Sequence, residues 1–200
     1  MTDDDAKTHD DLALEASYLI DPQTLGLLVV DVQEKLFPLI HDREEVQRRV
    51  VQAIQVAGHL ELPIFVTEQY VKGLGASLPE VRDALERFGA YDPFEKLAFS
   101  CLGEPDFVAR VAESPVETLV LCGIESHVCV LQTALDALDR GLDVYYLAEA
   151  TGSRDPRHKR EAIERVRDAG AVIGSVEMLA FEAMRTSKHP RFKDVQRVIL

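Results

Sequence analysis

Residues 119–138, LVLCGIESHVCVLQTALDAL, decide the fold that the sequence predicts. The stretch begins as an apolar run typical of a buried strand, turns at Gly123, and continues with apolar residues at helical spacing. Cys129 falls in the first turn of the expected helix, with Ser126 as its expected N-cap. Backbone N–H groups at a helix start favour negative charge, so a thiol there is expected to ionise readily and act as a nucleophile. The alternative is a structural cysteine, because cysteine is among the most buried residues.

The same alternation of strand and helix runs along the rest of the chain. Apolar runs at 25–30, 63–67, 117–122, 143–147 and 171–174 alternate with helical patterns at 44–60, 79–88, 105–113, 128–139, 157–169 and 176–186. This order predicts an α/β protein with three α/β/α layers and a doubly wound, mostly parallel sheet. Residues 1–18 are predicted to form an acidic, flexible tail, and residues 19–200 a single domain.

Composition indicates which partners and compartments to expect. The chain has 200 residues, 46% of them hydrophobic, and a net charge of -13, which disfavours binding to nucleic acid or to an anionic membrane. No long apolar stretch predicts a membrane span, so we expect no membrane partner. The three cysteines lack the spacing of a disulfide framework or a zinc site. Reduced thiols and a cytoplasmic location are therefore predicted.

Two ionisable residues stand at places where parallel strands present functional groups. Asp31 directly follows the apolar run LGLLVV at 25–30, which puts it at the sheet edge where open α/β sheets bind ligands, although it could simply cap a helix. Lys96 lies among apolar residues in DPFEKLAFS at 92–100. A lysine in such a segment either snorkels to the surface or is buried for a purpose.

Taken in order, Asp31, Lys96 and Cys129 resemble the catalytic triad of the isochorismatase-like cysteine hydrolases. The segments DVQEKLF (31–37), FEKLAFS (94–100) and GIESHVCV (123–130) are similar to the opening, lysine and nucleophile motifs of that family. TEQYVKGLG (67–75) and ATGSRDP (150–156) extend the resemblance over nearly everything after residue 20. The chain looks closest to the poorly characterised isochorismatase-domain proteins, which are related to nicotinamidases and N-carbamoylsarcosine amidases. The resemblance implies an isochorismatase-like hydrolase fold for residues 19–200.

An activity follows from this resemblance. It implies a hydrolase of the amidohydrolase type, in which Asp31 accepts the thiol proton, Lys96 supports the negative charges and Cys129 attacks an amide-like substrate to form a thioester. It also implies a cis peptide bond between Ile124 and Glu125, with the backbone N–H groups of Glu125 and Cys129 as the oxyanion hole. Lys96 and the helix start are expected to lower the thiol pKa. The alternatives are a vinyl ether hydrolase of the isochorismatase type and a non-catalytic binding or scaffold protein that retains the triad.

Residues close to the triad in the sequence are candidates for the substrate pocket, with one exception. Gln33, Phe37, Glu68 and Tyr70 lie near the expected strand ends and are predicted to line the substrate pocket, and Gln69 is a further candidate. His127 could form a dyad with the thiol, but two residues before it on a tight turn we expect a turn-stabilising role.

Cofactors and assembly are predicted by comparison with the family. Nicotinamidases hold a metal with an Asp and two His after the second strand, whereas TEQYVKGLGASLPE at 67–80 contains no histidine. We therefore expect no metal and no other cofactor. The expected partners are a small-molecule substrate and further copies of the chain, in a homodimer or homotetramer.

Overall fold

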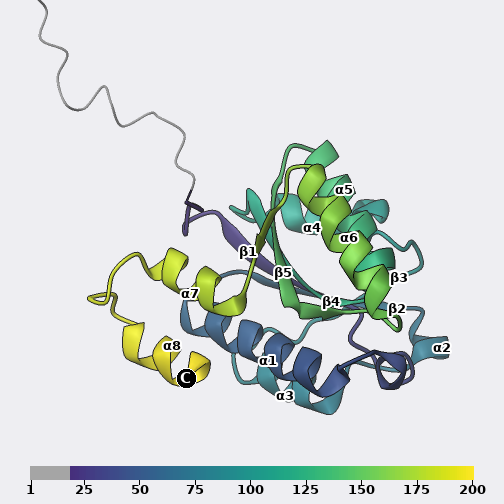
Figure 1. The fold of residues 1–200 in the computed structure, drawn as a ribbon, viewed down its shortest axis with the longest axis horizontal. Helices are drawn as coiled ribbons and strands as arrows, with labels where there is room; N and C mark the ends of the chain where they lie inside the picture. Colours follow the sequence, from purple (N-terminus) through teal and green to yellow (C-terminus); the bar gives the residue numbers. More distant parts are fainter. Residues whose placement is uncertain (1–18) are drawn as a thin grey trace, which may run out of the picture.

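A six-stranded sheet, in which every strand pairing is parallel, forms the centre of the computed structural model, which describes residues 19–200 (Figure 1). The predicted tail at 1–18 lies outside the described residues. The strand order is β3-β2-β1-β4-β5-β6. The strands are β1 (Leu25–Val30), β2 (Ile64–Gln69), β3 (Phe94–Lys96), β4 (Thr118–Ile124), β5 (Asp143–Gly152) and β6 (Val172–Gly174).

Helices cover both faces of this sheet, which confirms the predicted three layers (Figure 1). On one face lie α1 (Arg43–His59), α3 (Pro79–Glu86), α7 (Val176–Met184) and α8 (Phe192–Ile199). On the other lie α4 (Pro105–Ala112), α5 (Leu131–Asp139) and α6 (Pro156–Asp168). Short turns fill the connections: α2 (Val71–Leu74), η2 (Phe37–Leu39), η3 (Cys101–Gly103) and the π-helical turn η4 (Ser126–Val130). Within residues 19–200 no helix has the length and apolar character needed to cross a bilayer.

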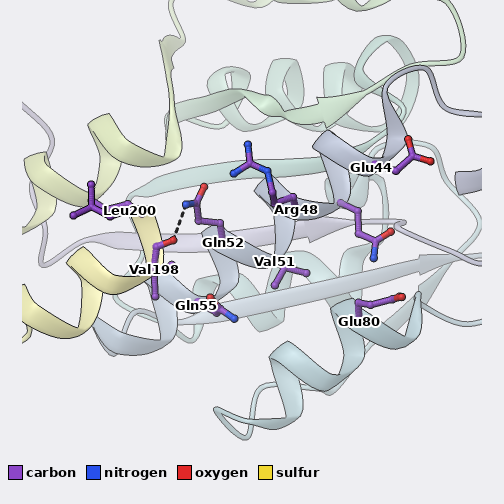
Figure 2. Close-up of a pocket in the computed structure, with 10 residues that line it drawn as sticks. Glu44, Arg48, Val51, Gln52, Gln55, Glu80, Val198 and Leu200 are labelled. Atoms are coloured by element: carbon purple, nitrogen blue, oxygen red, sulfur yellow. Dashed lines mark hydrogen bonds between the residues drawn. The ribbon is translucent and has the colours of Figure 1, made fainter.

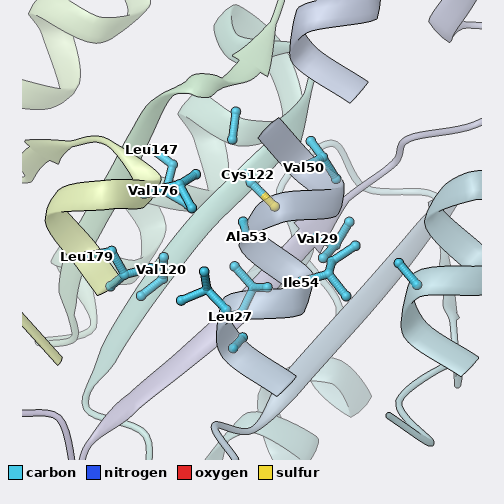
Figure 3. Close-up of a cluster of buried hydrophobic side chains, with 14 of the residues drawn as sticks. Leu27, Val29, Val50, Ala53, Ile54, Val120, Cys122, Leu147, Val176 and Leu179 are labelled. Carbon is cyan, nitrogen blue, oxygen red and sulfur yellow. The ribbon is translucent and has the colours of Figure 1, made fainter. Parts of the chain in front are cut away.

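The central strands are apolar along their whole length because both of their faces are buried. In β1, Leu27 and Val29 belong to the core beneath α1, whereas Leu28 and Val30 belong to the core beneath α5. Figure 3 shows the first of these cores, where α1 packs against side chains from β1, β4 and β5. A strand buried on two sides needs no polar alternation, so its sequence is an unbroken apolar run.

The sequence patterns predicted most of the helices and strands, but several of these elements end at other residues than predicted. The strand predicted at 63–67 continues to Gln69, and the one predicted at 143–147 continues to Gly152. Helix α8 and the three-residue strand β3 were not predicted. Both are short, and β3 is recognisable as a strand only through its pairing with β2. On α7, Phe181 is exposed and Met184 is buried.

Gly123 shows how closely β1 and β4 approach at the end of the sheet. It has a φ of +113°, and a Cβ atom there would lie 2.1 Å from the carbonyl oxygen of Val30. The contact is with backbone, which cannot rotate away, so only glycine fits.

We predict that Gly123→Ala lowers the free energy of unfolding by roughly 3 kcal/mol, because it adds a backbone clash to an unfavourable φ. Gly170→Ala is the matched control, since Gly170 has a φ of +110° with no atom within 4 Å of the added Cβ. Its cost is expected to be about 1 kcal/mol. Urea unfolding of both variants measures the difference, and equal losses would contradict the close approach.

Candidate active site

The predicted triad residues lie at the carboxyl edge of the sheet, around the point where the strand order reverses. Asp31 follows β1, Lys96 ends β3, and Cys129 lies in η4, which follows β4. The chain continues from β1 towards β2 and from β4 towards β5, so the connections diverge between these two adjacent strands. Ligands of open α/β sheets bind in the crevice at such a switch point.

A fully buried ion pair joins two of these residues. Lys96 Nζ lies 2.7 Å from Asp31 Oδ2, and both side chains have an exposure of 0%. The ammonium also donates to Gln69 Oε1 (2.7 Å) and to the carbonyl oxygens of Ala98 (3.1 Å) and Phe99 (3.0 Å). Burial alone lowers the pKa of Lys96, but the Asp31 charge and two nearby thiols outweigh it, so the net pKa is raised. Lys96 is therefore a buried cation and not a snorkelling side chain.

The two carboxylate oxygens of Asp31 have different surroundings. Oδ1 accepts a hydrogen bond from Thr67 Oγ1 at 2.8 Å, and Thr67 Oγ1 also lies 3.5 Å from the sulfur of Cys101. Oδ2 is buried and has no directed hydrogen bond among the described residues. Its 2.7 Å contact with Lys96 is an ion pair, so a lone pair on Oδ2 stays available to another donor.

Cys129 is 6% exposed and responds to both charges of the ion pair. Burial raises the pKa of its thiol, the Asp31 carboxylate raises it further, and Lys96 lowers it. The net shift is upward, so the predicted lowering of the thiol pKa is wrong. The physical reason is that the thiolate would lose its hydration beside an existing anion, a cost that one ammonium does not offset.

The turn that carries Cys129 also differs from the expected one. Its first residue is Ser126, and Glu125 occupies the N-cap position without a side-chain capping bond, so the assignment of Ser126 as N-cap is wrong. The hydroxyl of Ser126 is buried and has no hydrogen-bond partner among the described residues. The Ile124–Glu125 peptide bond is cis, as the resemblance implied.

His127 makes its polar contacts away from the thiol. Its Nδ1 lies 3.0 Å from the hydroxyl of Ser153, and its ring centroid lies 4.7 Å from that of His158. Burial lowers the pKa of His127. These contacts link η4 to the residues that follow β5, which is the turn-stabilising role expected from the sequence.

Gln33 and Phe37, which the sequence predicts to line the pocket, are both buried. Gln33 is buried, and its amide nitrogen donates to the carbonyls of Gln69 (3.0 Å) and Gly75 (2.6 Å) while its oxygen accepts from the Gln69 N–H (2.7 Å). Phe37 is part of the hydrophobic core beside α1. These contacts hold the loops that follow β1 and β2, and a place for either side chain in the substrate pocket stays a prediction.

Glu68 is held by hydrogen bonds from nearby residues, whereas Tyr70 is exposed. Glu68 Oε1 accepts hydrogen bonds from the N–H and hydroxyl of Ser77 (2.7 and 2.8 Å) and from the Tyr91 hydroxyl (3.1 Å). Its role in the substrate pocket stays a prediction. Tyr70 is exposed at the end of β2, with a φ of 40°. It remains a predicted pocket residue.

Sequence reasoning missed Thr67 as part of the site, and it considered Gln69 for the pocket but not as a partner of Lys96. Thr67 binds Asp31 and Gln69 binds Lys96, each at the carboxyl end of β2. Their position could have revealed them, because β2 lies between β1, which precedes Asp31, and β3, which carries Lys96. Alternate residues of a strand point to the same face, so both side chains can reach the pair.

A cavity of about 560 Å³ lies elsewhere, between α1 and α8 (Figure 2). Gln52 donates to the carbonyl of Val198 across it at 2.7 Å. Its lining includes no residue of the triad and no hydrogen-bond partner of Asp31 or Lys96. This cavity is therefore separate from the buried charges of Asp31 and Lys96, and buried ionisable groups of this kind are typical of functional sites.

Among residues 19–200, no cluster of three or more His, Cys, Asp or Glu side chains has an arrangement that could hold a metal ion.

Comparisons with known proteins agree with this architecture. The model of the isochorismatase domain matches residues 26–178. Isochorismatase domain-containing protein 2 of Xenopus laevis is 36% identical over 87% of this chain and 82% of its own length. Isochorismatase domain-containing protein 1 of Danio rerio is 36% identical over 90% of this chain, which spans 62% of that protein. A solved structure described as the MAR1 ribonuclease of Caenorhabditis elegans superposes with a TM-score of 0.83, at 36% identity, over 90% of this chain and 92% of that one.

We predict that Thr67→Val lowers the free energy of unfolding by about 2 kcal/mol, because a buried carboxylate oxygen loses its only hydroxyl donor. Thr67→Ser keeps the donor and is expected to lose less than about 1 kcal/mol. Chemical unfolding at neutral pH measures both variants. If valine is tolerated as well as serine, the hydroxyl does not hold Asp31.

Proposed function

Because the chain belongs to the isochorismatase family, we propose that it is a cysteine-dependent hydrolase that cleaves a C–N bond of a small amide-like substrate. The observation that carries the proposal is the buried carboxylate–ammonium pair whose two charges both act on the Cys129 thiol. A thiol, a base with a free lone pair and a fixed cation are the parts that covalent catalysis needs. We assign these roles to Cys129, Asp31 and Lys96.

In the proposed first step, a proton moves within the triad. The raised pKa of Cys129 means that the resting site holds a neutral thiol beside the Asp31–Lys96 ion pair. When a substrate carbonyl carbon approaches, Asp31 Oδ2 accepts the thiol proton and the sulfur attacks that carbon. The net charge of the pocket is unchanged by this transfer, because Lys96 still faces one anion.

The proposed intermediate carries its negative charge on the former carbonyl oxygen. The backbone N–H groups of Glu125 and Cys129 would donate to this oxygen, a contribution of roughly 3 kcal/mol in comparable sites. Asp31 then returns the proton to the leaving nitrogen, the C–N bond breaks, and an amine or ammonia leaves a thioester on Cys129. Water adds to the thioester while Asp31 takes its proton, the C–S bond breaks, and a carboxylic acid and the thiol are released.

Other activities are less consistent with these residues. A vinyl ether hydrolase would use Asp31 as an acid and would leave Cys129 without a role. A binding or scaffold protein would leave the costly buried ion pair without a role. Ribonuclease activity is a second candidate, because the Caenorhabditis elegans structure at 36% identity is described as a ribonuclease. The net charge of -13 opposes binding of a polyanion such as RNA.

The remaining features of the proposal come from the sequence. The proposed chemistry needs no metal or other cofactor. A cytoplasmic location and a homodimer or homotetramer remain predictions. Met178 and Phe181 on α7, which are 49% and 45% exposed, offer apolar area for contact between copies.

We predict that Cys129→Ala abolishes ammonia or amine release from a panel of amides, ureides and N-carbamoyl compounds, because no thioester can form. Cys122→Ala is the control, since Cys122 is a core residue of the opposite face and should retain most of the parent rate. RNA incubated with the same proteins tests the second candidate. Undiminished turnover by the Cys129 variant would exclude covalent catalysis, and RNA cleavage that requires Cys129 would replace the amide proposal.

A second prediction concerns the pH at which Cys129 reacts with iodoacetamide. Because Asp31 raises the thiol pKa, Asp31→Asn should move the reaction to lower pH. Because Lys96 lowers the thiol pKa, Lys96→Met should move the reaction to higher pH. We expect shifts of about one pH unit or more in these opposite directions. Rates measured by mass spectrometry of the Cys129 peptide provide the test.

Each of these variants leaves one buried charge unpaired and is expected to lose about 3 kcal/mol or more of stability. Thermal unfolding therefore accompanies every rate measurement, and the double variant Asp31→Asn/Lys96→Met serves as the control without either charge. If the pH profiles of alkylation in the two single variants overlay that of the parent, or move in the same direction, the two charges do not act on the thiol.

A further inference from the structure

Residues 97–99, which we call the lysine loop, contact Lys96 through their backbone and leave two large side chains in solvent. Lys96 Nζ donates to the carbonyl oxygens of Ala98 (3.1 Å) and Phe99 (3.0 Å). Leu97 is 70% exposed and Phe99 is 55% exposed. Burial of both side chains would contribute free energy that this conformation does not gain. The loop conformation therefore serves the carbonyl oxygens and not the side chains.

Glu104 holds the lysine loop by its N–H groups. Its Oε1 accepts hydrogen bonds from the N–H of Leu97 at 2.9 Å and from that of Ala98 at 2.8 Å. These two bonds lower the pKa of Glu104, and the charge of Lys96 lowers it further. Ala98 donates to Glu104 with its N–H and accepts from Lys96 with its carbonyl. A single residue of the loop thus connects the two charged groups.

The carboxylate of Glu104 is not needed by the helix that follows it. Glu104 occupies the N-cap position of α4, but its side chain makes no capping hydrogen bond. An N-cap side chain normally accepts a backbone N–H of the first helical turn. Here the carboxylate accepts two N–H groups of the lysine loop instead. A substitution of Glu104 therefore removes support from the loop and no cap from α4.

The three protons of the Lys96 ammonium have three neutral acceptors. An ammonium group has three N–H donors. Gln69 Oε1 accepts one at 2.7 Å, and the carbonyls of Ala98 and Phe99 accept the others. Asp31 Oδ2 lies 2.7 Å from the same nitrogen but has no directed hydrogen bond among the described residues. The neutral oxygens therefore hold the ammonium in place without cancelling its charge.

That charge acts on the nucleophile as well as on the carboxylate. Lys96 lowers the thiol pKa of Cys129, against the effects of burial and of Asp31. Without the loop carbonyls, two of the three protons would turn to water or to Asp31 Oδ2, where a charge-assisted hydrogen bond is strong. The cation would then be directed at one anion, and its support for a thiolate on Cys129 would decrease.

We propose that Glu104 is a positioning residue for Lys96: it holds the lysine loop so that the ammonium stays on neutral oxygens and faces both the base and the nucleophile. This inference rests on the proposed function, in which these charges control the nucleophile. The described side-chain hydrogen bonds of Glu104 go to the loop, so its effect on Cys129 passes through Ala98 and Lys96.

The test is the rate at which iodoacetamide alkylates Cys129 in Glu104→Ala and Glu104→Gln, at one pH on the rising part of the rate profile. Both variants remove the carboxylate charge, but glutamine keeps an oxygen that accepts the two loop N–H groups. We expect Glu104→Ala to react about fivefold more slowly than the parent, and Glu104→Gln to stay within about twofold of it.

Two controls separate positioning from general effects. Glu95→Ala removes the same charge beside Lys96 in the sequence, but Glu95 Oε1 accepts the N–H of Val71 instead of the lysine loop. Its rate is expected to stay within about twofold of the parent. In the Lys96→Met background, Glu104→Ala is expected to change the rate by less than about twofold, because no ammonium is left to position. A fivefold fall in either control would overturn the inference.

Equal rates for the parent and Glu104→Ala, or an equal fall in Glu104→Ala and Glu104→Gln, would also overturn it, because the loop hydrogen bonds would then have no effect on the thiol. If Glu104→Ala does not fold, Gly103→Ala takes its place. A Cβ atom at Gly103 would lie 2.9 Å from that of Ala98, so it displaces the lysine loop and leaves Glu104 intact. A fall of about fivefold is expected there too, and an unchanged rate would contradict the inference.

A second measurement separates failure of this inference from failure of the proposed function. Alkylation needs no turnover, so a parent without hydrolytic activity would refute the proposed function and still allow this test. Should Cys129 not react with iodoacetamide, the NMR signal of the Lys96 ammonium is followed, since buried, hydrogen-bonded protons exchange slowly with water. We expect the signal in the parent and in Glu104→Gln, and its loss in Glu104→Ala. A signal that persists in Glu104→Ala would overturn the inference.

Discussion

The buried ion pair between Asp31 and Lys96 is the constraint on which the carboxyl edge of the sheet depends. Removing two charges from water costs several kcal/mol for each ion, and their attraction offsets that cost only with good geometry and further hydrogen bonds. The structure supplies these through Thr67 on the carboxylate and through Gln69 and two carbonyl oxygens on the ammonium. Because Asp31 follows β1, Thr67 and Gln69 lie on β2, and Lys96 ends β3, the pair also requires these three strands to be in register.

The same pair determines the resting state of the thiol. Burial and the carboxylate keep the proton on Cys129, while the ammonium limits that effect. A neutral thiol beside a base with a free lone pair differs from a permanently ionised cysteine, because the nucleophile forms only as the proton moves to Asp31. Cys101, whose pKa is raised to about 11 by burial and by Asp31, lies close to the same charges and stays protonated at neutral pH.

Several polar residues near the site serve to hold its loops in place. Gln33 joins the segment after β1 to the segment after β2, and Glu68 gathers Ser77 and Tyr91 around the end of β2. On the other side, Glu125 anchors Arg154, and His127 contacts Ser153. Among the described residues, Asp31 Oδ2 has the ion pair with Lys96 as its polar contact, and the buried Ser126 hydroxyl has no hydrogen-bond partner. Oδ2 of Asp31 is the atom to which we assign the proton transfer in the proposed reaction.

The sequence by itself determined the layered α/β fold, the parallel sheet and the order of the triad motifs. These depend on local periodicity and on residues that directly follow strands, so a linear pattern is sufficient. Tertiary structure alone decided the direction of the Cys129 pKa shift and the structural roles of Gln33, Phe37, Glu68 and Ser126. Gln33 bonds Gly75, 42 residues away, and Glu68 bonds Tyr91, 23 residues away. Desolvation and partners at such separations exist only after the strands have assembled, so a linear sequence does not reveal them.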